Sequence, residues 1–327
     1  MRLDSLCALG ACAAAMLLIG CGGPPYMPAR DVPAPPAAPA GVEHGSDTFT
    51  SVGNVAIFEQ WWRPPGGARA VLVVVHGLKD HSSRYAELAA HLVERGIAVY
   101  AMDLRGHAHS AGVRVGVDSF EDYLVDLDTL VAHARAREPG APVFLFGHSM
   151  GGAIATLWTI ERQPKLSGLV LSGAALVVNV SGAKVLGTNL VSAITPNAGV
   201  FQLDITKFSR DPQVVAACEN DPLVYQDGAP AHTAHELLGA LDAIGPRMHD
   251  VRVPLLVMHG GADEVTDPDG SRYLVARAET LDKTLHIWPG LVHDLLHEPE
   301  KAQVIAEIVT WIDQRAPKAK PAPAPAP

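Results

Sequence analysis

Ser149 lies at the centre of a pentapeptide whose spacing suits nucleophilic chemistry. Residues 147–151 read GHSMG, which fits the pattern G-x-S-x-G. This pattern is typical of a sharp turn from a strand into a helix, which holds a serine hydroxyl clear of the backbone. An apolar run at 142–147 precedes Ser149, and a segment able to form a helix, SMGGAIATLWTIERQ, follows it. These flanking segments favour a nucleophilic serine over a serine in an ordinary turn.

A nucleophilic serine needs a base that accepts its proton and a carboxylate that orients the base. Where the serine lies on such a turn, the order along the chain is serine, acid, histidine. Asp263 follows the apolar run 254–260, and His293 lies in the loop after the run 284–290. We therefore expect a catalytic triad of Ser149, Asp263 and His293. The alternatives are the acids Glu264 and Asp267 and the histidines His286 and His297.

Attack of a serine on a carbonyl creates a negative oxygen, which two backbone N–H groups must stabilise. One donor is expected from Met150, directly after the nucleophile. The other is expected from Leu78, in the turn after the apolar run 70–77. His76, at the end of that run, is expected to shape the turn.

The remaining histidines and cysteines do not predict a metal centre or a cofactor. His107 and His109 are two residues apart near Asp103, but no further ligand cluster accompanies them. Cys218 is expected to be a small buried apolar residue, because the mature domain offers it no partner for a disulfide.

Six short apolar runs, rich in β-branched residues, are typical of buried parallel strands. Helical stripes of apolar residues separate several of them, so the pattern predicts an α/β fold with a mostly parallel central sheet flanked by helices. A pair of strands within 48–64 is expected at an antiparallel edge. The six runs are 70–77, 97–103, 142–147, 166–173, 254–260 and 284–290.

One long interval interrupts this alternation and predicts a helical cap inserted before the penultimate strand. Residues 176–246 are rich in Gly, Pro and Asn, with apolar patches that suit short helices. A long excursion between two sheet strands is usually a functional insertion. The core is accordingly expected to comprise 47–175 and 247–316.

The N-terminus has the composition of an export signal. Residues 1–20 contain an apolar stretch that is short for a membrane span, and LIGC at 18–21 matches a bacterial lipobox. We expect lipidation of Cys21 and a membrane-anchored location in the bacterial cell envelope. An ordinary cleaved signal and an uncleaved anchor are the alternatives, and both also imply export. Residues 21–46 and 317–327 are expected to be a Pro/Ala-rich linker and a disordered Pro/Ala-rich tail.

The charge balance argues against nucleic acid as a partner. The 327 residues carry a formal net charge of -10 at pH 7, and the sequence pI is about 5.8. An acidic chain does not attract a phosphate backbone. Its hydrophobic content of 48% is ample for a buried core.

Several segments together resemble the monoacylglycerol lipase and lysophospholipase group of α/β-hydrolases. These are HGLKDHSSRY, DLRGHAHS, FLFGHSMGGAIA, SRDPQVVAACENDPLVY and KTLHIWPGLVHDLLHEPE. The resemblance implies a triad at Ser149, Asp263 and His293 and oxyanion donors at Leu78 and Met150. It also implies hydrolysis of a small amphiphilic ester, such as a monoacylglycerol or lysophospholipid, with the cap forming an apolar tunnel.

One position departs from the group, because Ala108 stands where a glycine is usual. If the loop needs a positive φ there, alanine costs about 1 kcal/mol. The same triad would also suit an acyltransferase, a thioesterase or an aminopeptidase. A non-catalytic lipid-binding surface lipoprotein is an alternative of another class.

Overall fold

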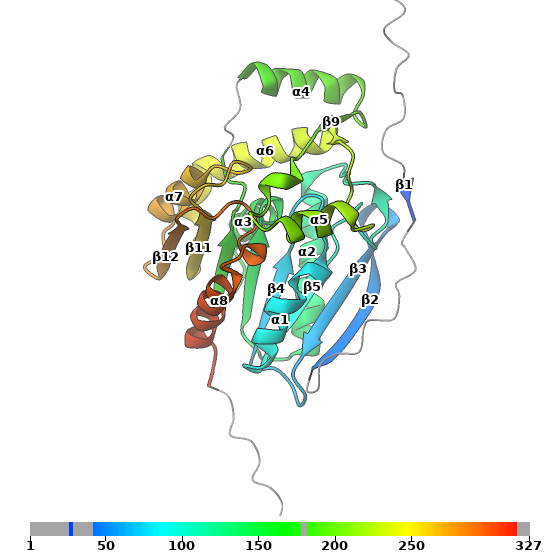
Figure 1. Cartoon of the computed structure of the whole chain (residues 1–327). Helices are drawn as coiled ribbons and strands as arrows, with labels where there is room; N and C mark the ends of the chain where they lie inside the picture. Colours follow the sequence, from blue (N-terminus) through cyan, green and yellow to red (C-terminus); the bar gives the residue numbers. More distant parts are fainter. Residues whose placement is uncertain (1–25, 29–41, 178–181, 319–327) are drawn as a thin grey trace, which may run out of the picture.

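The computed structural model describes residues 26–28, 42–177 and 182–318. At its centre is a sheet of eight strands in the order β12-β11-β8-β7-β4-β5-β3-β2 (Figure 1). β3 pairs antiparallel with β2 and β5, and the other neighbours pair in parallel. The strands are β2 (Glu43–Ser51), β3 (Val55–Arg63), β4 (Ala70–Val75), β5 (Ile97–Met102), β7 (Val143–His148), β8 (Gly168–Ser172), β11 (Leu255–Gly260) and β12 (Lys283–Trp288).

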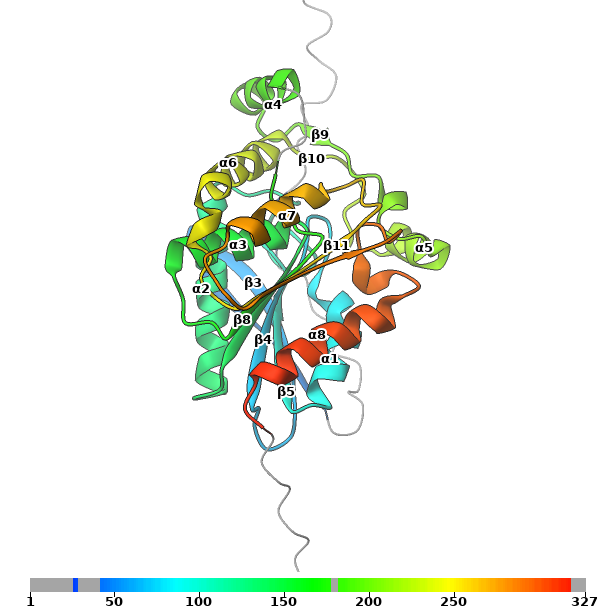
Figure 2. The same cartoon turned by 90° about the vertical axis from the view of Figure 1, so that its left-hand side faces the viewer.

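Helices cover both faces of the sheet (Figure 2). One face packs on α1 and α8, and the other packs on α2 and α3. Alternate residues of β4 point to opposite faces, so Val71, Val73 and Val75 join one core while Ala70, Leu72 and Val74 join the other. This explains why the parallel strands are continuous apolar runs. The helices are α1 (Ala86–Val93), α2 (Phe120–Arg137), α3 (Met150–Arg162), α7 (Pro268–Arg277) and α8 (Lys301–Arg315).

The excursion between β8 and β11 forms the expected helical cap beyond the carboxyl ends of the strands (Figures 1 and 2). α6 crosses above α3, and α4 packs on α6 from outside. The cap contains α4 (Gly182–Ile194), β9 (Gly199–Phe201), α5 (Pro212–Asn220), β10 (Ala229–Pro230) and α6 (Ala231–Arg247).

The antiparallel edge pair predicted within 48–64 is present as β2 and β3, but it begins earlier than expected. The sequence predicts a linker up to residue 46, whereas β2 already begins at Glu43, opposite Arg63 of β3. The residues EHGS at this end of β2 lack an apolar alternation, so only their pairing with β3 reveals them as strand. Within the same predicted linker, β1 (Tyr26–Met27) pairs antiparallel with β6 (Gly112–Val113).

The loop after β5 adopts the conformation that its sequence makes costly. Ala108 has φ 40, in the left-handed region, and is completely buried. The positive φ considered for this position is therefore present, at a cost of about 1 kcal/mol.

The predicted signal peptide and Cys21 lie outside the described residues. Among the described helices, none combines the length and the hydropathy that a membrane span requires.

Candidate active site

Ser149 occupies a strained turn between β7 and α3. Its φ of 54 and ψ of -122 are unusual for a residue with a side chain. A Cβ on Gly147 would lie 2.5 Å from the carbonyl oxygen of Gly151, and a Cβ on Gly151 would lie 2.2 Å from the carbonyl oxygen of Val75. Both glycines are thus required for the helix to pack closely on the strands, which holds the serine in place.

Ser149, His293 and Asp263 form one hydrogen-bonded chain. The distance from Nε2 of His293 to Oγ of Ser149 is 2.9 Å, and the distance from Nδ1 to Oδ2 of Asp263 is 2.8 Å. An ionised carboxylate only accepts, so Nδ1 carries the proton and Nε2 is free to accept the serine proton. The three side chains follow β7, β11 and β12, whose carboxyl ends lie at one edge of the sheet.

The surroundings of Asp263 keep it ionised. Its side chain is completely buried, and burial alone would raise its pKa. Attraction to His293 in its protonated form, and hydrogen bonds from His259, from His293 and from the Thr266 backbone, instead hold the pKa of Asp263 well below its usual range. A buried acceptor beside His293 favours the imidazolium that forms when the serine loses its proton.

The alternative acids and histidines have other contacts. Asp267 caps α7 by accepting from the N–H of Asp269, and Glu264 pairs with Lys207. His286 contacts Glu307, with 2.7 Å between Nδ1 and Oε2. His297 lies 2.9 Å from Asp294. Of the three histidines considered, His293 is the one within hydrogen-bond distance of Ser149.

The two predicted oxyanion donors lie beside the serine. Leu78 and Met150 both line the same cavity as Ser149. Met150 is the first residue of α3, where a backbone N–H has no acceptor within the helix. His76 is bonded on both sides: Nε2 accepts from the N–H of Leu104 at 2.9 Å, and Nδ1 donates to the carbonyl of Gly77 at 2.7 Å. This is consistent with a role for His76 in shaping the turn that carries Leu78.

A cavity of about 950 Å³ connects Ser149 to the cap. Five residues of α6 line it: Thr233 and, at helical spacing, the apolar residues Ala234, Leu237, Leu238 and Leu241. Val177 and Leu203 add further apolar surface, while Asp263 and Thr266 bring polar atoms to the serine end. Such a cavity suits a ligand with one long apolar part and a reactive polar group.

A buried network of ion pairs next to the site could not be predicted from the sequence. Arg84 contacts Oδ1 of Asp80 at 3.0 Å and Oδ2 of Asp294 at 2.7 Å. Burial alone would raise the pKa of Asp294, but His297 and Arg84 hold it well below its usual range. The network ties the turn after β4 to the loop that carries His293. It joins residues some two hundred positions apart, so no local pattern indicates it.

The residues considered for a metal have structural contacts. Asp103 accepts from the N–H and hydroxyl of Ser82 and lies 3.0 Å from Nδ1 of His109. Across the part of the chain that the structure describes, no group of three or more His, Cys, Asp or Glu side chains is arranged to hold a metal ion. Cys218 is buried, and burial raises the pKa of its thiol.

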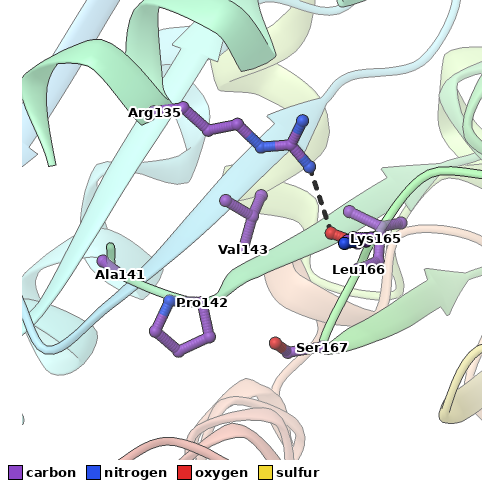
Figure 3. Close-up of a pocket in the computed structure, with 7 residues that line it drawn as sticks. All are labelled: Arg135, Ala141, Pro142, Val143, Lys165, Leu166 and Ser167. Atoms are coloured by element: carbon purple, nitrogen blue, oxygen red, sulfur yellow. Dashed lines mark hydrogen bonds between the residues drawn. The ribbon is translucent and has the colours of Figure 1, made fainter. Parts of the chain in front are cut away.

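A second cavity, of about 400 Å³, is drawn with its lining residues in Figure 3. It is next to the start of β7 and β8, and Arg135 donates to the carbonyl of Lys165 there at 3.0 Å. Its lining includes no member of the Ser149 site.

The fold and this site define the chain as a serine hydrolase of the α/β-hydrolase class. A family profile described as "Serine aminopeptidase, S33" matches residues 66–300, and the chain belongs to this family. Monoacylglycerol lipase of Mycolicibacterium smegmatis is 36% identical over 267 residues, which cover 81% of this chain and 95% of the relative. Human monoglyceride lipase is 36% identical over 264 residues, which cover 79% of this chain and 87% of the relative.

A solved structure agrees with these relatives. The crystal structure of Paleococcus ferrophilus monoacylglycerol lipase has a TM-score of 0.71 at 28% identity, covering 84% of this chain and all of that one. The chain is therefore a serine ester hydrolase of the monoglyceride lipase type.

Proposed function

We propose that the chain hydrolyses monoacylglycerols through a triad of Ser149, His293 and Asp263. The observation that carries the proposal is the hydrogen-bonded chain from Ser149 to Asp263 at the end of a large apolar cavity. The names of the relatives at 36% identity support the same substrate class.

The first half of the reaction forms an acyl-enzyme. Oγ of Ser149 attacks the ester carbonyl while Nε2 of His293 takes the hydroxyl proton. The N–H groups of Leu78 and Met150 donate to the negative oxygen of the tetrahedral intermediate. When the intermediate collapses, the bond to the glycerol oxygen breaks, and His293 returns the proton to that oxygen.

Water completes the reaction by the same route. His293 takes a proton from water as the water oxygen attacks the acyl-enzyme carbonyl. Collapse of the second intermediate releases a fatty acid and restores the Ser149 hydroxyl with the proton from His293. Asp263 stays ionised throughout and stabilises the imidazolium.

Hydrolysis of a substrate panel by the full chain in detergent micelles tests this function. The panel contains monoacylglycerols and p-nitrophenyl esters of 2 to 18 carbons, lysophospholipids, an acyl thioester and an amino-acid p-nitroanilide. We expect the highest kcat/KM for monoacylglycerols with long acyl chains and loss of hydrolysis in Ser149→Ala. Preference confined to 2 to 4 carbons, or to the anilide, would contradict the monoacylglycerol proposal. Transfer of the acyl group to added glycerol faster than to water would identify an acyltransferase.

We propose in addition that Cys21 carries a lipid that anchors the chain in the bacterial cell envelope. The lipobox at 18–21 supports this. More than one acyl chain is needed for stable anchoring, and an anchored enzyme meets substrates that partition into membranes. Metabolic labelling with a fatty acid should mark the wild type and not Cys21→Ala. Unlabelled wild type would contradict lipidation.

A further inference from the structure

His259 is a completely buried histidine that has no part in the reaction described above. It lies near the end of β11, four residues before Asp263, and its side chain has no exposed surface. A buried imidazole needs polar partners, because burial of unpaired polar atoms is costly. One of the polar partners of His259 is Asp263 of the proposed triad.

Each ring nitrogen of His259 has a defined neighbour. Nδ1 is 2.7 Å from Oγ of Ser271 on α7. Nε2 is 3.1 Å from Oδ2 of Asp263, and it is also 3.3 Å from the carbonyl oxygen and 3.2 Å from Oγ1 of Thr266. An ionised carboxylate and a carbonyl can only accept, so Nε2 must carry a proton. In the neutral ring, Nδ1 then accepts the hydroxyl proton of Ser271, which fixes the tautomer.

Two imidazoles therefore meet at one carboxylate oxygen. Oδ2 of Asp263 is 2.8 Å from Nδ1 of His293 on one side and 3.1 Å from Nε2 of His259 on the other. We propose that His259 is a positioning residue that acts through Asp263: its N–H orients the carboxylate and withdraws part of its negative charge from His293. This inference rests on the proposed function of the triad.

The hydroxyl of Thr266 is the other polar group at this oxygen. Its Oγ1 lies 2.9 Å from Oδ2 of Asp263 and 2.9 Å from the carbonyl of Gly173 after β8, so its single proton can serve either acceptor. Oδ1 of Asp263 accepts from the backbone N–H groups of Val265 and Thr266. The backbone thus fixes one oxygen, while His259, His293 and the Thr266 hydroxyl surround the other.

The titratable groups around His259 are few. Asp263 faces it from the loop after β11, and His293 lies behind that carboxylate, on the loop after β12. Ser271 faces it from α7 but does not titrate in the working range. Asp267, the other acid near α7, caps that helix through the N–H of Asp269. The charge that His259 influences is accordingly that of Asp263.

Removing the N–H should change how activity depends on pH. A carboxylate that keeps its full charge holds the proton of the imidazolium more tightly, and only neutral His293 can act as the base. In His259→Leu we expect the acid limb of kcat/KM to move to higher pH by about 0.5 to 1 unit. At pH values below the limb, this shift lowers kcat/KM about three- to tenfold. We expect KM to be unchanged, because His259 does not line the cavity.

Two further variants separate positioning from structure. His259→Gln keeps an N–H donor and should return the limb toward the wild-type position. Ser271→Ala removes the partner that fixes the tautomer, and should shift the limb in the same direction as His259→Leu but less. Val257→Ala, on the same strand with its side chain in the core, is the matched control: it should lower Tm without moving the limb.

The proposal is overturned if the acid limb stays in place in His259→Leu, or if activity falls by the same factor at every pH. If His259→Leu does not fold, an unchanged limb in Ser271→Ala overturns it. These results differ from failure of the proposed function, which would show as unchanged hydrolysis in Ser149→Ala.

Discussion

Lys79 (φ 62) and Ser149 (φ 54) are residues with side chains whose backbone has a positive φ. Strained residues of this kind persist where the surrounding structure holds them. For Ser149 the strain presents the hydroxyl to His293. Lys79 follows Leu78, the proposed oxyanion donor, and burial of its side chain adds a second energetic cost to the backbone strain. Its ammonium is buried and has no hydrogen-bond partner among the described residues.

Lys79→Gly should therefore stabilise the protein. Burial lowers the pKa of Lys79, and the charge of Asp227 offsets this only in part. Glycine removes both the strained side chain and the buried charge, so we expect the free energy of unfolding to rise by about 1 kcal/mol, measured by urea unfolding. Asn54→Gly, at φ 58 in an exposed turn, is the control and should change stability by less than about 0.5 kcal/mol. A lower stability in Lys79→Gly would show that the ammonium has a favourable environment.

At the scale of residues, the sequence predicts a site most directly where chemistry requires a fixed order along the chain. Ser149, Asp263 and His293 were predicted from their order after three strands, and they lie within hydrogen-bond distance of one another; their catalytic roles stay a proposal. His259 and Asp294 could not be predicted in the same way. Their contacts depend on the packing of α7 and of the turn after β4, which leaves no periodic signal.

At the scale of elements, α6 contributes more residues to the cavity beside Ser149 than any other helix of the cap. Ala234, Leu237, Leu238 and Leu241 form one stripe along it, and all four line the cavity. The sequence predicts a helix here from its apolar spacing. It does not predict that this stripe faces Ser149, because the same spacing would suit a helix packed on a closed core.

A bulkier residue in this stripe should shorten the accepted acyl chain. In Ala234→Phe we expect kcat/KM to fall at least about tenfold for esters of 16 to 18 carbons, because overpacking of a fitted cavity costs about 1 to 3 kcal/mol. Esters of 2 to 4 carbons should be hydrolysed at nearly the wild-type rate. The assay is hydrolysis of a p-nitrophenyl ester series.

Asp242→Phe is the control for this series, because Asp242 is exposed on the same helix and does not line the cavity. It should retain the wild-type chain-length profile. An equal loss for short and long esters in Ala234→Phe would contradict the assignment of the acyl chain to this cavity.

The start of the edge strand β2 could not be predicted from the sequence, for a different reason. The parallel strands could be predicted because both faces of each strand are buried, so that each strand is a continuous apolar run. β2 is an edge strand with an exposed face, and its first four residues are polar or glycine. Such a strand is defined by backbone pairing with β3, and its start at Glu43 has no counterpart in the hydrophobic pattern.

At the scale of the whole molecule, the sheet separates two cores that enclose several neutral histidines. Burial lowers the pKa of His107 to about 3 and that of His148 to about 4, whereas an unfolded histidine titrates near 6.5. Between these values the unfolded chain binds protons that the folded chain does not. Stability should therefore fall as the pH decreases from about 6.5 to 4.

His107→Gln should reduce this pH dependence. Each such histidine contributes about 1.4 kcal/mol per pH unit within the window, so the variant should lose stability more slowly than wild type between pH 7 and 4.5. Urea unfolding at a series of pH values measures the slope. His249→Gln, at an exposed position, should keep the wild-type slope. Equal slopes for His107→Gln and wild type would contradict the assignment.

The buried carboxylates affect stability in a different pH range. The pKa of Asp80, of Asp103 and of Asp263 is held below the usual range by neighbouring cations and hydrogen-bond donors, despite burial, which acts in the opposite direction. Their contribution to stability is present above about pH 4 and is lost as the pH falls below it. The carboxylates therefore do not mask the loss of stability that the buried histidines cause between about pH 6.5 and 4.

The most direct test of the account is covalent labelling of the full chain with a fluorophosphonate probe, followed by peptide mass analysis. Such a probe reports a serine that a neighbouring base has activated. We expect one adduct, on Ser149, and no labelling of Ser149→Ala. An unlabelled wild type, or an adduct that persists in Ser149→Ala, would contradict the assignment of Ser149 as the nucleophile.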